Sequence, residues 1–135
     1  MRAVVQKTTE SSVWVDDREK AGIKNGLLVL LGIKKGDDES AAEYMMDKII
    51  NLRIFEDEDG KMNKSLANVG GELLMVSQFT LYGDARKGRR PSFTEAEDPG
   101  RASRLFDYCV EYARNKDIIV KTGVFGASMQ VHIVN

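Results

Sequence analysis

The longest apolar run in the chain predicts a strand that is buried on both of its faces. It covers residues 27–31 and extends through Gly32 to Ile33. A strand that faces water on one side alternates apolar and polar residues, so an uninterrupted run indicates cover above and below. The Asn25-Gly26 pair in front of it is typical of a two-residue turn, and we expect a hairpin there.

Other segments have the spacing of strands. Residues 2–7 and 12–15 are rich in β-formers, and 53–55 predict a short strand. Residues 72–76 predict another strand, which is apolar after Glu72 until the chain reaches Ser77. In the last segment apolar side chains alternate with mostly polar ones, which predicts a strand with one apolar face: Phe125, Ala127, Met129, Val131 and Ile133.

Two segments carry apolar residues at helical spacing. The first follows a cap at Asp37 or Asp38, and its stripe consists of Ala42, Met45, Met46, Ile49 and Ile50. The second begins at Asp98-Pro99, ends near Arg114, and has a stripe formed by Ala102, Leu105, Phe106, Cys109, Val110 and Ala113. The pattern predicts an α+β fold: a mostly antiparallel sheet or open β-barrel with two amphipathic helices packed on it. No linker divides the sequence, so we expect a single domain over residues 1–135.

Composition limits the partners and the compartment that can be expected for the protein. The 135 residues carry a net charge of −1, so no overall field attracts the molecule to nucleic acid or to an anionic membrane. The single cysteine excludes an internal disulfide and fits a reducing compartment. The apolar runs are too short to span a membrane, and the amino terminus turns polar too early for a secretory signal. These features predict a cytoplasmic protein.

The common catalytic sets are missing. A serine triad needs a histidine, and the only one, His132, is expected on the polar face of the last strand. Ser77 lacks the glycine elbow of a nucleophilic serine. One cysteine and one histidine do not make a zinc site, and no glycine motif for phosphate binding follows a strand. We therefore expect no metal and no cofactor.

Two features remain as candidates. The polar junction Ser77-Gln78-Phe79-Thr80 ends an apolar strand and can present hydroxyls, an amide and backbone N–H groups to a developing oxyanion. Alternatively, its polar groups bond the neighbouring strand. The second feature is the cation cluster Arg86, Lys87, Arg89 and Arg90 around Gly88, which suits phosphate contacts or is a solvated surface. Together they suggest a small polar pocket beside a phosphate-binding loop.

Several ordered motifs resemble one known family, the D-aminoacyl-tRNA deacylases. They are the 26–32 run, 52–55 with 60–63, Val76-Ser77-Gln78-Phe79-Thr80-Leu81, the 88–93 segment and the 123–131 segment, so the resemblance spans essentially the whole chain.

The resemblance implies a cytoplasmic homodimer, with its active site at the dimer interface, that hydrolyses the ester between a D-amino acid or glycine and the 3′-terminal adenosine of tRNA. It implies catalytic roles for Ser77, Gln78 and Phe79. Substrate contacts would come from Thr80, Phe125, Gly126, Ala127 and Met129, and contacts along the tRNA acceptor end from Arg86, Lys87, Arg89 and Arg90. No membrane and no DNA partner is implied.

The sequence departs from the family pattern at its end. Family members continue with an asparagine, a Gly-Pro pair and a threonine, whereas this sequence stops at Asn135. In the family the Gly-Pro pair rejects L-amino acids. Either the sequence is cut short, which we favour, or the native protein ends here. In both cases we expect that a chain of this length has lost stereospecificity or activity. The alternatives are a module that binds the tRNA acceptor end without hydrolysis and a dimeric structural protein.

Overall fold

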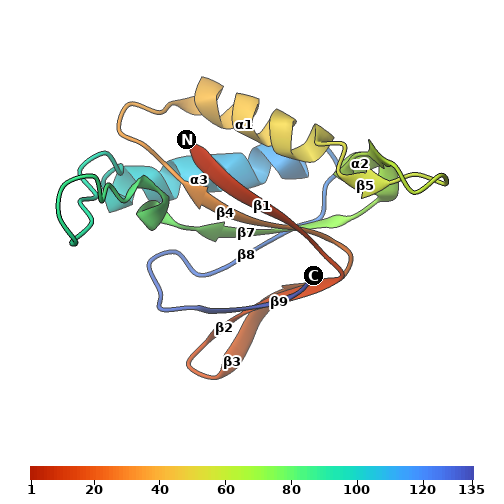
Figure 1. Cartoon of the computed structure of the whole chain (residues 1–135), viewed down its shortest axis with the longest axis horizontal. Helices are drawn as coiled ribbons and strands as arrows, with labels where there is room; N and C mark the ends of the chain where they lie inside the picture. Colours follow the sequence, from red (N-terminus) through yellow and green to blue (C-terminus); the bar gives the residue numbers. More distant parts are fainter.

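The computed structural model describes residues 1–135 and has three layers (Figure 1). Two long helices, α1 (Glu39–Asn51) and α3 (Pro99–Arg114), cover one face of a four-stranded sheet, and a three-stranded sheet lies against the other face. The first sheet has the order β1 (Arg2–Thr8), β4 (Gly26–Gly32), β7 (Glu72–Ser77) and β8 (Val120–Thr122). The second has the order β3 (Arg18–Ile23), β2 (Glu10–Val15) and β9 (Gln130–Val134).

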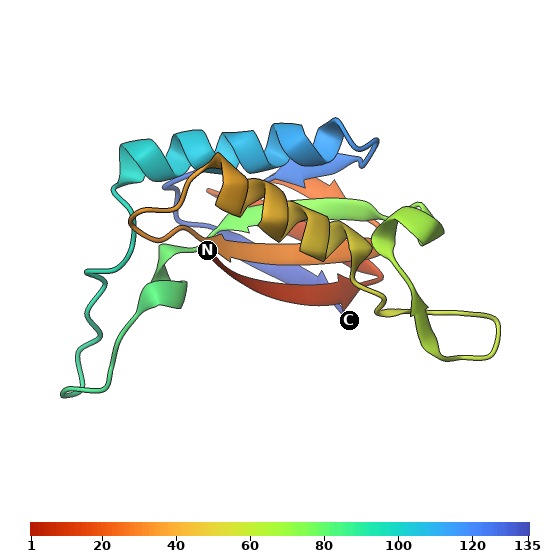
Figure 2. The ribbon, with the colours of Figure 1, turned by 90° about the horizontal axis from the view of Figure 1, so that it is seen from above.

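The remaining elements are short. β5 (Phe55–Glu56) and β6 (Met62–Lys64) form a small hairpin, α2 (Leu66–Val69) is a single turn, and the 3₁₀ helix η1 (Phe79–Tyr82) follows β7. The hairpin and the loop between η1 and α3 project at opposite ends of the molecule (Figure 2). No helix is both long enough and apolar enough to cross a membrane.

Strand pairing agrees with the predicted fold class. β1–β4, β2–β3, β2–β9 and β5–β6 are antiparallel, whereas β7 runs parallel to both β4 and β8. The α+β class and the two amphipathic helices are confirmed, and the sheets do not close into a barrel. The short helix α2 was not predicted.

The central strands are buried on both faces, as the apolar run predicts. Leu27 and Leu31 of β4 belong to the large core between the sheet and the helices, whereas Leu28 belongs to a smaller core between the two sheets. In β7, Met75 faces the helices and Leu74 faces the second sheet. Alternation along a strand therefore fills two cores from one continuous apolar segment.

Both long helices begin where the sequence predicts. The Asp38 carboxylate accepts the N–H of Ala41 at 2.9 Å and caps α1. Asp98 precedes Pro99 at the start of α3, but its side chain makes no capping bond. The predicted stripes are buried, apart from the partly buried Met45 and Ala102.

The hairpin predicted at Asn25-Gly26 is wrong. β3 and β4, on either side of it, belong to different sheets. Gly26 serves close packing instead, because a Cβ there would meet the Glu72 carbonyl oxygen at 1.9 Å. The hairpin turn lies earlier, where Asp16 and Asp17 both adopt positive φ between β2 and β3.

Two predicted strands have other bounds. The short strand expected at 53–55 is Phe55–Glu56, and the last strand begins only at Gln130. The alternation at 125–129 misled the prediction because Val124 to Ala127 form a turn. In that turn the N–H of Ala127 donates to the carbonyl of Val124 at 3.1 Å, and Gly126 has a φ of 75°.

Candidate active site

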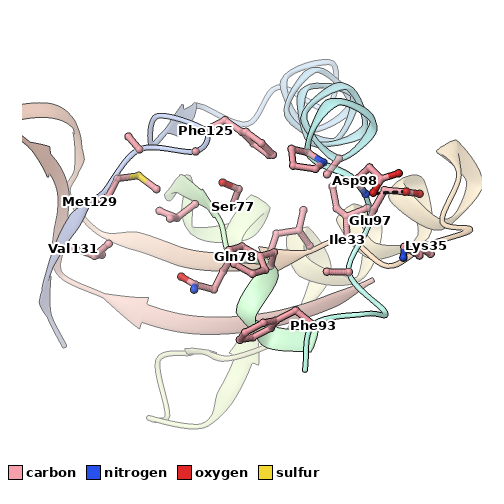
Figure 3. Close-up of a pocket in the computed structure, with 18 residues that line it drawn as sticks. Ile33, Lys35, Ser77, Gln78, Phe93, Glu97, Asp98, Phe125, Met129 and Val131 are labelled. Atoms are coloured by element: carbon pink, nitrogen blue, oxygen red, sulfur yellow. Dashed lines mark hydrogen bonds between the residues drawn. The ribbon is translucent and has the colours of Figure 1, made fainter. Parts of the chain in front are cut away.

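A pocket of about 650 Å³ opens where the ends of β7 and β9 approach the start of α3 (Figure 3). The lining is mostly apolar, with a few polar groups, as is usual for small-molecule sites. It brings together seven of the predicted site residues: Ser77, Gln78, Phe79, Phe125, Gly126, Ala127 and Met129. The predicted residues Thr80, Arg86, Lys87, Arg89 and Arg90 do not line it.

Ser77 ends β7 and lies between Phe125 and Gln78 in the view of Figure 3. Its hydroxyl has no hydrogen-bond partner within the chain. No buried side-chain oxygen or nitrogen lacks a partner, so this hydroxyl is open to the pocket. A free hydroxyl at the end of a buried strand is available to a ligand.

Gln78 and Thr80 use their polar groups for bonds within the protein, which is the alternative that the sequence left open. The N–H of Gln78 donates to the Leu31 carbonyl at 2.8 Å, and the carbonyl of Gln78 accepts the N–H of Leu81 at 3.3 Å. The Gln78 side-chain amide donates to the hydroxyl of Thr80. These bonds stabilise the junction itself, so the N–H of Gln78 is not free for an oxyanion.

The N–H groups of Phe79 and Thr80 differ from the N–H of Gln78 in their place in the chain. Phe79 and Thr80 are the first residues of the 3₁₀ helix, and the first N–H groups of a helix have no partner within it. Phe79 lines the pocket directly beside Ser77 and Gln78. Ser77, with its free hydroxyl, and Phe79, at the start of the 3₁₀ helix, therefore line the same part of the pocket.

The opposite wall is the turn between β8 and β9. The Phe125 ring packs edge-on against Phe106 of α3, with 6.2 Å between centroids. Met129 packs against Gly123, where a Cβ would lie 2.7 Å from the sulfur. A side chain at 123 would therefore displace the Met129 thioether from this wall.

The pocket also has a charged rim, which the sequence pattern did not indicate. Lys35, Glu97 and Asp98 line one end of the pocket (Figure 3). The Glu97 side chain is only 7% exposed, and it accepts the N–H of Asp98 at 3.0 Å and pairs with Arg101 at 3.4 Å. Asp98 was predicted as a helix start, but no local pattern indicates that this start faces Ser77.

The cation cluster lies on a closed loop outside the pocket. Asp84 and Ser92 exchange backbone hydrogen bonds of 2.8 and 2.9 Å, and Gly88 near the tip has a φ of 80°. Arg86 donates to the Asp84 carboxylate, and these bonds lower the pKa of Asp84 to about 2. Lys87, Arg89 and Arg90 are exposed and form no salt bridge.

The remaining candidates lie apart from this chemistry. His132 does not line the pocket, and its ring lies 5.7 Å from that of Trp14. Cys109 is buried in the helix core, and burial raises the pKa of its thiol to about 12. A thiol with so high a pKa is not a nucleophile at neutral pH.

Several known proteins are similar over nearly the whole chain. A protein of Syntrophomonas wolfei named D-aminoacyl-tRNA deacylase is 58% identical over 135 residues, which are all of this chain and 91% of that protein. A protein of the same name from Thermotoga petrophila is 53% identical with the same coverage.

Solved structures are also similar to this chain. One named c-Myc DNA Unwinding Element Binding Protein matches with a TM-score of 0.94 and 43% identity, covering 100% of this chain and 92% of that one. Another, described as a probable eukaryotic D-amino acid tRNA deacylase, matches with a TM-score of 0.79 over 97% of this chain and 91% of that one. At 16% identity this second likeness shows the fold alone. The family model described as D-Tyr-tRNA(Tyr) deacylase matches residues 4–135, and the chain belongs to that family.

Proposed function

We propose that this protein hydrolyses the ester bond of D-aminoacyl-tRNA and releases the free D-amino acid and tRNA. The observation that carries the proposal is the pocket, in which the family's Ser77-Gln78-Phe79 segment faces the Phe125–Met129 segment. Full-length relatives named D-aminoacyl-tRNA deacylase support the same reaction.

The chemistry assigned to this wall is positioning and charge stabilisation. The backbone N–H of Phe79 donates to the ester carbonyl oxygen as negative charge develops there, and the Ser77 hydroxyl orients the terminal adenosine or the ester. Gln78 acts indirectly, since its bonds to Leu31 and Thr80 hold the turn in place.

Water supplies the attacking oxygen, and the C–O bond to the ribose breaks. The 3′-oxygen leaves with a proton, and the neighbouring 2′-hydroxyl can assist this transfer. An aminoacyl ester is already activated, so a histidine base is not required for the step. Ser77 is therefore assigned a positioning role and not a nucleophilic one.

Glycyl-tRNA is included among the proposed substrates. A pocket that discriminates the hand of an amino acid by shape must exclude the side chain of the L-form. Glycine has no side chain to exclude, so such a pocket accepts its ester.

The tRNA acceptor end is assigned to the side of the pocket that carries the loop of residues 84–92. Lys87, Arg89 and Arg90 have free charges there for phosphates. DNA lacks the 2′-hydroxyl and is not proposed as a partner. Because one similar structure carries a DNA-related name, DNA of matching sequence belongs in the binding assay as a competitor.

A homodimer with the site at its interface is also part of the proposal. Strand β9 ends one sheet and leaves apolar side chains exposed, among them Ile133 and Val134, with Val124 nearby in the chain. A second copy that covers them would lie along the strand whose Val131, with the neighbouring Met129, lines the pocket. An enzyme that acts on aminoacyl-tRNA works where translation occurs, so a cytoplasmic location is proposed.

The test is deacylation of D-tyrosyl-tRNA by purified protein of confirmed mass, with L-tyrosyl-tRNA and glycyl-tRNA in parallel. Release of D-tyrosine and glycine above the spontaneous rate supports the proposal. A shift of tRNA mobility without release supports the acceptor-end binding module instead. Light scattering of the same sample reports the oligomeric state.

A further inference from the structure

Phe79 and Phe93 form an exposed aromatic pair at the mouth of the pocket. Their rings meet edge to face with 5.2 Å between centroids, yet 58% and 38% of their surfaces are exposed. Both residues line the pocket, and Phe93 lies on the same side of it as Gln78 (Figure 3). Burying an aromatic ring is strongly favourable, so two exposed rings held together indicate a surface for a partner.

Backbone hydrogen bonds and one packing contact fix the segments that carry both rings. The Phe93 ring packs over Gly83, where a Cβ would lie 3.0 Å from the ring. Phe93 directly follows Ser92, whose bonds with Asp84 close the loop, and Phe79 directly follows Gln78, which is bonded to Leu31. A surface ordered before the ligand arrives loses little entropy on binding.

The aromatic pair connects the pocket with the free cations. Along the chain, Phe93 is the first residue beyond the closed loop that carries Lys87, Arg89 and Arg90. Proteins bind single-stranded nucleic acid with cations along the phosphates and aromatic faces beneath the bases. The two kinds of group are neighbours along the chain here.

We infer that the Phe79–Phe93 pair is a stacking platform for the nucleobase that precedes the terminal adenosine of the tRNA acceptor end. The inference rests on the proposed function, because the terminal adenosine must occupy the pocket. A strand that enters the pocket past the cationic loop then brings its next base over the exposed rings. Single-stranded RNA uses both cations and aromatic faces, and both are present here. RNA is therefore favoured over a second copy of the chain as the occupant.

The experiment measures binding and does not depend on hydrolysis. A short fluorescent RNA with the tRNA 3′-end sequence is compared with the same RNA lacking the base before the terminal adenosine. Wild-type protein should bind the intact RNA roughly 5- to 150-fold more tightly, the range for loss of one stacked base. Phe93→Leu should abolish most of that difference, and Phe93→Trp should keep it.

The control is another exposed aromatic residue. Tyr44 is 66% exposed and lies near Lys48 on α1, away from the pocket, so Tyr44→Leu should leave the difference between the two RNAs intact. Phe79 is left unchanged because its N–H belongs to the proposed oxyanion site.

Other outcomes overturn the inference. Equal binding of both RNAs by wild-type protein, or no binding of either, contradicts the platform whether or not the protein hydrolyses esters. An equal loss for both RNAs in Phe93→Leu assigns Phe93 to loop structure. If Phe93→Leu changes the oligomeric state but keeps the difference in affinity between the two RNAs, the pair belongs to an interface between copies of the chain. Deacylation that fails while the base effect persists overturns only the proposed reaction.

Discussion

The backbone N–H of Gln78 donates to the carbonyl oxygen of Leu31 at 2.8 Å, just before the chain turns into the 3₁₀ helix. This bond keeps β7 beside β4 until the strand ends. Ser77 is thereby held with its hydroxyl open to the pocket, and Phe79 begins the 3₁₀ helix that follows. The position of the site thus follows from where one parallel strand pair ends.

Ser77→Ala should lower kcat/KM for D-tyrosyl-tRNA by about tenfold, because one hydrogen bond to the substrate is lost. Substrate binding should weaken together with turnover if the residue positions the ester. Single-turnover kinetics separates the two effects. Ser40→Ala, at an exposed serine of α1 outside the pocket, is the control. An acyl-Ser77 adduct trapped in mass spectrometry would refute the positioning role.

Gly126→Ala should destabilise the protein by about 1–2 kcal/mol, because Gly126 has a φ of 75° and a side chain is strained there. It should also impair deacylation, because the turn forms one wall of the pocket. Gly60→Ala is a matched control with a φ of 74° in the distant β5–β6 turn. Urea denaturation should show similar losses, whereas only Gly126→Ala should raise KM. Equal KM values for the two variants would exclude this wall from substrate binding.

Arg89→Ala should weaken tRNA binding and reduce the slope of log affinity against log salt by roughly one. Arg86→Ala should have a smaller effect, since that guanidinium is already bonded to Asp84. Binding measured over a series of salt concentrations tests both variants. If neither variant changes the slope, the cations are a solvated surface without phosphate contacts.

The loop should loosen only in acid. The bonds from Arg86 lower the pKa of Asp84 from 3.8 to about 2, so folding favours the charged carboxylate. A lowered pKa stabilises the folded loop above pH 4, and the benefit is lost as pH falls from about 4 to 2. Carboxyl NMR titration should show the low pKa, and Arg86→Ala should bring it back toward 3.8. An unchanged titration in that variant would exclude Arg86 as the cause.

Gly26→Ala should cost roughly 3 kcal/mol or more, because its Cβ would lie 1.9 Å from the Glu72 carbonyl oxygen between β4 and β7. Gly100→Ala is the contrasting variant: its nearest contact is a flexible arginine end at 3.9 Å, and alanine favours the helix. Thermal unfolding of both proteins provides the comparison. Similar melting temperatures would mean that the two strands separate easily at this point.

The sequence alone determined the features that depend on local spacing. The starts and stripes of α1 and α3 and the two-sided burial of residues 27–31 follow from residue periodicity, because each position repeats the same exposure along its element. The Ser77–Thr80 junction can also be identified from the sequence, since its polar residues interrupt an apolar strand. The role of residues 125–129 in the site could be predicted only from the family resemblance.

Only the tertiary structure decided the pairings and the shape of the pocket. Asn25-Gly26 resembles a hairpin turn, yet β3 and β4 belong to different sheets, and Gly26 is required by the backbone of Glu72. The rim of Lys35 and Glu97 and the aromatic pair of Phe79 and Phe93 join segments distant in the chain. Local periodicity reports which side of an element is buried, whereas the partner that buries it is selected by packing of the whole chain.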